Sequence, residues 1–176
     1  MHNAPTEAAD SLASAGAKKR FQMIEHIYTL GYTGLQPAQV YELARMKEAL
    51  VVDVRKNPIP QKTTWQRRVL ADLMQSYYVS LPPCGNENYK AAGAAAIQIA
   101  NMEDCLYCLG LYADDPLHQY QAFILLCTCP SHAQCHRSKV ALALNDYLPT
   151  HPTVIHWSTS KARSMLAYQQ AKLSLS

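Results

Sequence analysis

The residues best suited to chemistry stand in one short segment of the chain. It contains Cys127, Cys129 and Cys135, which could supply a thiolate or bind a metal ion, and Cys135 is followed directly by His136 and Arg137. An apolar run precedes the segment and an amphipathic run follows it, which is the pattern of a buried strand, a loop and a helix. Because unpaired N–H groups and the dipole at a helix N-terminus attract anions, the segment predicts a site for a negatively charged ligand.

Two arginines, Arg55 and Arg137, are the main indication that the ligand is anionic. A guanidinium group donates paired hydrogen bonds to phosphate or carboxylate and keeps its charge. Ser138 could cap the expected helix and add a hydroxyl group to the phosphate cradle. A structural role is also open to both arginines, since Arg55 could pair with Asp53, and Arg137 with a carboxylate elsewhere.

Three residues are candidates for catalysis. Cys135 beside His136 at a helix N-terminus could have a lowered pKa and act as a nucleophile, although a reduced cysteine is often simply a small buried apolar residue. Asp53 could act as a general base or orient His136, or it could be a loop-capping acceptor. Tyr32 and Asn86 could form hydrogen bonds with a ligand, or they could form turns.

Metal binding is a separate possibility. Cys105-x-x-Cys108 with Cys127-x-Cys129 and Cys135 provides enough soft ligands for zinc or an iron-sulfur cluster. Against a metal site, the first pair lies in an expected helix without the glycine-rich knuckle of zinc ribbons, and Cys127 and Cys129 would share one face of a strand. The sequence therefore requires no cofactor, and the ligands of any metal present are expected to be Cys127, Cys129 and Cys135.

The elements that must position these residues alternate between strand and helix. This alternation predicts an α/β fold with a mostly parallel five-stranded sheet flanked by helices, a Rossmann-like three-layer arrangement. The expected domain covers residues 22–176 and follows a flexible arm, residues 1–21, that ends in basic residues. The expected strands are 23–30, 49–55, 77–81, 123–127 and 153–157, and the expected helices are 36–48, one from Thr63 or Thr64, 89–111, one from Ser138, and 160–173. Because ligands bind at the carboxyl ends of parallel strands, Tyr32, Asp53, Arg55, Asn86 and residues 135–137 should meet at one edge.

These loops carry a family resemblance. In chain order, the motifs are Gly31-Tyr32-Thr33, Asp53-Val54-Arg55-Lys56-Asn57-Pro58, Leu81-Pro82 with Gly85-Asn86, and Cys135-His136-Arg137-Ser138. The ordered set, from about residue 27 to residue 157, resembles the bacterial family named domain of unknown function 488. The resemblance implies the fold and the place of the site, but no reaction. The chain departs from the family at residues 127–132, where Cys-Thr-Cys-Pro-Ser-His replaces a segment that often carries acidic residues or lysine.

Composition sets limits on the class of protein. The chain has 176 residues, a net charge of +3, 49% hydrophobic and 16% charged residues, which is typical of one globular domain. The N-terminus lacks the apolar core of a signal peptide, so we expect reduced thiols and a cytoplasmic location. The longest run of small apolar residues, 91–100, is too short to cross a membrane.

Two functions remain open from the sequence. The first is an enzyme that acts on a phosphorylated or nucleotide-like small molecule. The second is a binding module without catalysis that reads a nucleotide or nucleic acid, because the segment 53–68 holds five basic residues around Trp65, although Trp65 could equally be a core residue beside a solvated helix face. A structural role with cysteine-bound zinc is a third reading, and the oligomeric state is not predicted.

Overall fold

The fold is built on a parallel sheet. The computed structural model describes residues 23–57, 63–89, 97–115, 117 and 120–175, so the predicted N-terminal arm lies outside the described residues. Within this part, five strands form one sheet with the order β3-β2-β4-β1-β5, and every pair of neighbours is parallel. The strands are β1 (His26–Gly31), β2 (Ala49–Asp53), β3 (Tyr78–Ser80), β4 (Ala122–Cys127) and β5 (Thr153–Trp157). The predicted α/β sheet of five strands is therefore confirmed.

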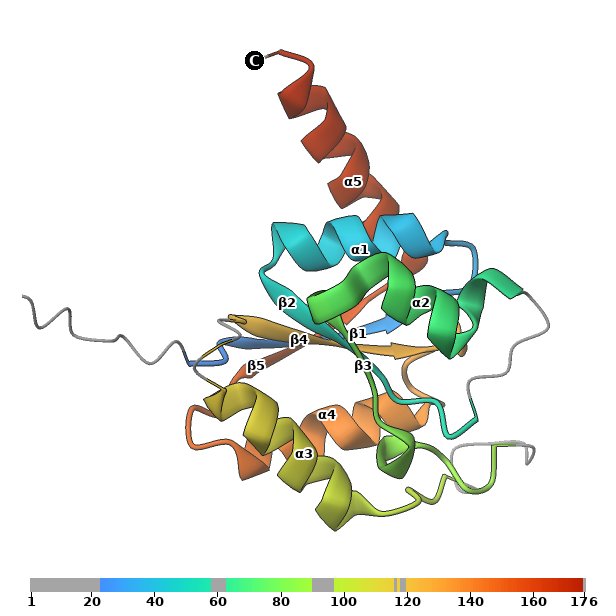
Figure 1. Cartoon of the computed structure of the whole chain (residues 1–176), viewed down its shortest axis with the longest axis vertical. Coiled ribbons are helices and arrows are strands. Elements are labelled where there is room, and N and C mark those ends of the chain that lie inside the picture. The colour runs from blue at the N-terminus through green and yellow to red at the C-terminus, as the bar shows by residue number, and fades with distance from the viewer. Residues whose placement is uncertain (1–22, 58–62, 90–96, 116, 118–119, 176) are drawn as a thin grey trace, which may run out of the picture.

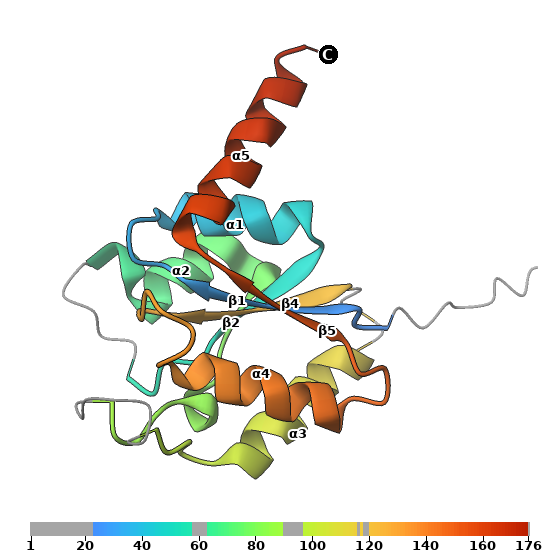
Figure 2. The same ribbon diagram turned by 180° about the vertical axis from the view of Figure 1, so that it is seen from behind.

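Helices cover both faces of the sheet. They are α1 (Pro37–Met46), α2 (Arg67–Met74), α3 (Met102–Asp114), α4 (His136–Tyr147) and α5 (Thr159–Leu173), with short 3₁₀ turns η1 (Thr63–Trp65), η2 (Gln75–Tyr77) and η3 (Pro82–Cys84). Figure 1 shows α1 and α2 on one face and α3 and α4 on the other, and the view from behind in Figure 2 shows the same three layers. Helix α5 starts beside α1 and its C-terminal part projects away from the body. None of the helices within the described residues has the length and apolar character needed to cross a membrane.

Alternate side chains of the strands enter two separate apolar cores. Strand β4 is buried at all six positions. Phe123 and Leu125 pack in the core beneath α3 and α4, whereas Ile124 and Leu126 pack in the core beneath α1, α2 and α5. Because successive residues of a strand point to opposite faces, a continuous apolar run is what a central strand covered on both sides requires.

Two predicted helices differ from the observed ones. The helix expected over 89–111 begins only at Met102, because Asn101 caps it by accepting a hydrogen bond from the backbone N–H of Asp104. Ile99 before it forms a β-bridge with Asn86, and residues 90–96 lie outside the described residues. The helix expected from Thr63 is divided into η1 and α2. The carbonyl of Trp65, which a continuous helix would use, accepts a hydrogen bond from a buried arginine instead.

A disulfide bond joins η3 to α3. Cys84 and Cys105 are both fully buried and are bonded to each other, with their Cα atoms 4.9 Å apart. Cys108, Cys127, Cys129 and Cys135 are free. The expectation that all thiols are reduced is therefore wrong for this pair. The two cysteines are 21 positions apart, and Asn86, Tyr89 and Ile97 between them line the pocket described below, so the bond joins the two ends of the segment that carries these residues.

Reduction of this bond is expected to destabilise the protein. A cross-link that closes a loop of this length removes chain entropy from the unfolded state, which corresponds to about 3 kcal/mol. We expect Cys84→Ser, Cys105→Ser and the double variant to lower the free energy of unfolding in urea by about that amount. Cys108→Ser is the matched control and should leave it unchanged. Six reactive thiols in the denatured, unreduced protein, in place of four, would contradict the bond.

Candidate functional site

A pocket with a volume of about 490 Å³ opens at the carboxyl edge of the sheet. It lies where β2 and β4 end and where α4 begins, which is the place that the sequence predicts for a ligand. The wall includes Arg55, Lys56, Asn86, Cys127, Cys129, Cys135 and His136. Four of the eight predicted site residues therefore line the pocket, namely Arg55, Asn86, Cys135 and His136.

A buried ion pair forms the base of this edge. The Arg55 Nε donates to Oδ1 of Asp53 at 2.7 Å, and Nη2 donates to Oδ2 at 2.6 Å. The backbone N–H of Arg55 also donates to Oδ1, at 3.2 Å. Asp53 has no exposed surface and Arg55 is 6% exposed. The pairing of Arg55 with Asp53, which the sequence left open, is thus present, and it largely balances the arginine charge.

The same pair holds three aromatic residues in place. Arg55 donates to the hydroxyl of Tyr32 at 3.0 Å and to the carbonyl of Trp65 at 2.9 Å, and the rings of Tyr32 and Trp65 stack with their centroids 3.9 Å apart. The Tyr78 hydroxyl donates to Oδ2 of Asp53 at 2.8 Å. Burial, together with the negative charge of Asp53, raises the pKa of Tyr78. Asp53 therefore orients Arg55 and Tyr78, and it makes no hydrogen bond to His136.

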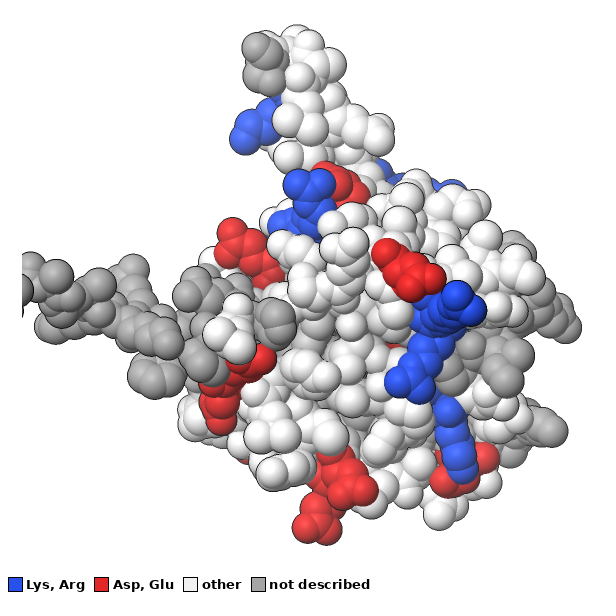
Figure 3. Space-filling model, in the orientation of Figure 1, with Lys and Arg blue, Asp and Glu red and all other residues white. Residues whose placement is uncertain are grey.

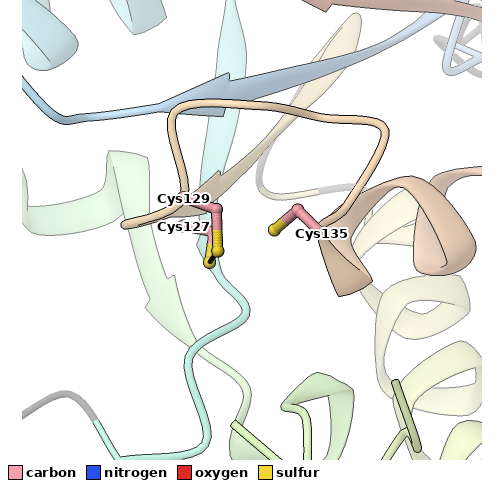
Figure 4. Close-up of side chains that lie close together, drawn as sticks. All are labelled: Cys127, Cys129 and Cys135. Carbon is pink, nitrogen blue, oxygen red and sulfur yellow. Dashed lines mark hydrogen bonds between the residues drawn. The ribbon is translucent and has the colours of Figure 1, made fainter. Parts of the chain in front are cut away.

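Three cysteine side chains meet at the wall of the pocket. Figure 4 shows Cys127 and Cys129 side by side, with the sulfur of Cys135 directed toward them from the start of α4. The three sulfur atoms lie within 4.8 Å of one another, and those of Cys127 and Cys129 are 3.8 Å apart. Residues two apart in an extended chain share a face, which explains why Cys127 and Cys129 point the same way. We refer to these three residues as the sulfur cluster.

His136 lies against the sulfur cluster with a defined tautomer. Its Nε2 is 2.6 Å from the carbonyl oxygen of Val54, so this nitrogen carries the proton and donates it. Nδ1 then presents a lone pair, 3.9 Å from the sulfur of Cys127 and 3.8 Å from that of Cys135. Burial lowers the pKa of His136, which keeps the imidazole neutral.

The environments of the three cysteines shift their pKa values in different directions. Hydrogen bonds from Cys129 and Cys135 hold the pKa of Cys127 well below its usual range, and the positive charge of Arg137 lowers it further. The pKa of Cys135 is raised, first because its thiol donates to Cys127 and then because it is buried. The geometry thus favours Cys127 as the thiolate, whereas the sequence analysis singled out Cys135. The Cys-x-Cys spacing of Cys127 and Cys129 was the signal in the sequence that could have indicated Cys127.

Arg137 is buried behind the pocket. It has no exposed surface and does not line the pocket. Nη1 donates to the carbonyl of Cys129 at 2.6 Å, and Nη2 is 3.5 Å from the carbonyl of Pro130. Nε has no acceptor, and across the described ranges no carboxylate oxygen lies within 4.0 Å of the guanidinium group. The charge of Arg137 therefore acts on the sulfur cluster, and the predicted direct contact of Arg137 with a ligand is not available in this geometry.

Three other predicted residues have structural contacts. Asn86 accepts two backbone hydrogen bonds at Oδ1, from Asn88 and Gln98, and so shapes the loop that it occupies beside the pocket. Ser138 is not the cap of α4, because the helix already begins at His136, and its hydroxyl donates to the carbonyl of His132. Tyr32 lies just beyond β1 and accepts hydrogen bonds from Arg55 and from the hydroxyl of Thr128.

A glycine at the end of β1 sets the position of Cys129. A Cβ atom at Gly31 would lie 2.1 Å from the carbonyl oxygen of Cys129, which is the oxygen that accepts from Arg137. Only glycine lets the backbone of residues 128–130 approach β1 so closely.

No family model, curated protein or solved structure matches this chain. The resemblance to the family named domain of unknown function 488 therefore stays a prediction, and the assignment of function depends on the site itself.

Loss of the Tyr78 hydroxyl is expected to destabilise the fold. Tyr78→Phe removes a hydrogen bond to a buried carboxylate and should lower the free energy of unfolding by about 1–2 kcal/mol at neutral pH. Because the folded-state pKa of Tyr78 is above its unfolded value of 10.0, this contribution is complete below pH 10.0 and is lost as the pH rises beyond it. Urea unfolding of both proteins from pH 7 to 11 measures this, with the exposed Tyr107→Phe as control. A difference that stays constant above pH 10.0 would contradict the assignment.

Substitution of Gly31 is expected to displace the cluster. Gly31→Ala should destabilise the protein by about 1–3 kcal/mol, because the new methyl group meets backbone atoms that cannot move independently. It should also increase the rate at which Cys129 reacts with a thiol reagent, measured by mass spectrometry of peptides. Gly110→Ala in α3 is the control, since the atoms nearest to its Cβ belong to the ring of Tyr147, which can shift. Equal stability of the two variants would refute this role of Gly31.

Proposed function

We propose that this protein is an enzyme that acts on a small anionic molecule, phosphorylated or nucleotide-like, bound at the carboxyl edge of the sheet. The observation that carries the proposal is the pocket that is lined by a cationic side chain, a helix N-terminus and the sulfur cluster with His136. The size of the pocket, about 490 Å³, is in the range of sites for small molecules.

Lys56 is the group best placed to bind an anion. Its side chain is 37% exposed, lines the pocket and forms an ion pair with Glu87 at the surface. An ion pair of this kind is weak, so a ligand can replace Glu87 at little cost. Arg55 also reaches the pocket, but Asp53 already balances its charge. Lys56 therefore supplies the attraction, and the N-terminus of α4 supplies further positive potential.

The groups that could take part in a reaction line the same pocket. The thiolate of Cys127 and the neutral Nδ1 of His136 can each accept a proton or bind an electrophile. Asp53 is a poor base, because both of its oxygens accept hydrogen bonds from Arg55.

Recognition of nucleic acid has less support. Trp65 is 3% exposed and stacks on Tyr32, so it is not available to stack on a base. On the face in Figure 3, basic side chains gather in a narrow strip on the right with acidic side chains at both of its ends, and the described residues of this face form no broad basic surface. A small ligand is therefore favoured.

Binding of anions tests the proposal through two substitutions that are expected to change the affinity in opposite directions. Lys56→Ala should weaken the binding of inorganic phosphate and nucleoside monophosphates by about tenfold. Glu87→Gln removes the ion-pair partner of Lys56 and should tighten the binding of the same anions by about two- to fivefold. Titration calorimetry at constant ionic strength measures both, and Lys172→Ala on the projecting end of α5 is the control.

Two results would contradict this function. Equal affinity of the three variants for the tested anions would show that the pocket does not bind them. Affinity for oligonucleotides that falls steeply with salt, without binding of the small anions, would favour the nucleic-acid module.

A further inference from the structure

We propose that the sulfur cluster binds a zinc ion through the thiolates of Cys127, Cys129 and Cys135, with the fourth coordination position facing the pocket. The open position gives the proposed enzyme a metal ion to which an anionic oxygen of the substrate or a water molecule can bind. This second part rests on the proposed function, whereas the three ligands stand on the geometry alone.

The spacing of the sulfur atoms fits a tetrahedral zinc ion. Zinc binds thiolates at about 2.3 Å, so two thiolates on one tetrahedral ion lie about 3.8 Å apart. The sulfur atoms of Cys127 and Cys129 are 3.8 Å apart, and all three lie within 4.8 Å of one another. The sulfur of Cys135 therefore has to approach the other two by no more than about 1 Å to complete the ligand set. Binding of zinc displaces the thiol protons to solvent.

The second observation is the unbalanced charge of Arg137. Among the residues that the structure describes, its fully buried guanidinium group has no carboxylate partner and its Nε has no acceptor, and a buried charge without an opposite charge is costly. A zinc ion with three thiolates carries a net charge of minus one, which matches the charge of the arginine. Arg137 also donates to the carbonyl of Cys129, one of the three proposed ligand residues. The arginine thus holds the loop and balances the metal site.

The fourth position is open because all three cysteines line the pocket. Zinc sites that do chemistry commonly have three protein ligands and one exchangeable position. His136 stands beside the sulfur atoms with its Nδ1 unprotonated. There it can accept a hydrogen bond from a water molecule at the open position, and its bond to Val54 keeps it in the required tautomer.

The test uses the full chain, purified without chelator and with a phosphine reductant, then loaded with zinc or cobalt and desalted. We expect about one metal ion per chain by elemental analysis. We also expect the thiolate-to-cobalt charge-transfer absorption and the visible bands of tetrahedral cobalt. Cys127→Ser, Cys129→Ser and Cys135→Ser should each lower the affinity for zinc by at least about tenfold. Cys108→Ser, which removes a free cysteine from α3, should bind as the wild type does.

The remaining outcomes separate the parts of the proposal. Absence of the charge-transfer band from the wild type, or its full retention in Cys127→Ser, would overturn the site whether or not the other variants fold. His136→Asn should keep the metal, and its complete loss there would overturn the open fourth position. Inorganic phosphate should shift the visible cobalt bands. A stoichiometric cobalt site that does not respond to phosphate would support the three ligands and contradict the proposed use of the pocket.

Discussion

The buried ion pair of Asp53 and Arg55 is the interaction on which the functional edge depends. It connects the end of β2 to Tyr32 after β1, to Trp65 before α2, and to Tyr78 on β3. Because either charge alone would be left uncompensated in the interior, loss of one partner typically costs about 3–5 kcal/mol. The pair also leaves Arg55 little freedom to turn toward a ligand, so it acts as the support of the pocket.

Two buried arginines at the same edge illustrate how surroundings decide the role of a residue type. Arg55 has a carboxylate as partner, whereas Arg137 has backbone carbonyls and lies behind the sulfur cluster. The interior therefore has one position where negative charge is already supplied and one where it is required. Hydrogen bonds from Cys129 and Cys135, and after them the positive charge of Arg137, lower the pKa of Cys127.

Local patterns predicted the fold better than the site. The runs that became β4 and β5 were clear because a continuous apolar stretch or a short β-branched stretch has few alternatives. The start of α3 was missed because alanine-rich residues favour helix intrinsically, while the cap at Asn101 decided the boundary. The sequence placed Cys135 and His136 at the pocket. The side chain of Arg137 points away from the pocket, because its direction depends on the position of the residue around α4. The disulfide depends on contacts between distant segments, which composition does not reveal.

The order of the strands has a consequence for how the chain is synthesised. β4 separates β1 from β2, and each of these earlier strands pairs with β4. A nascent chain that has not yet released residues 122–127 from the ribosome cannot join its first two strands into the sheet. Until then β2 can pair only with β3, and β1 has no neighbour, so apolar strand edges stay exposed at the stage where a chaperone would be most useful.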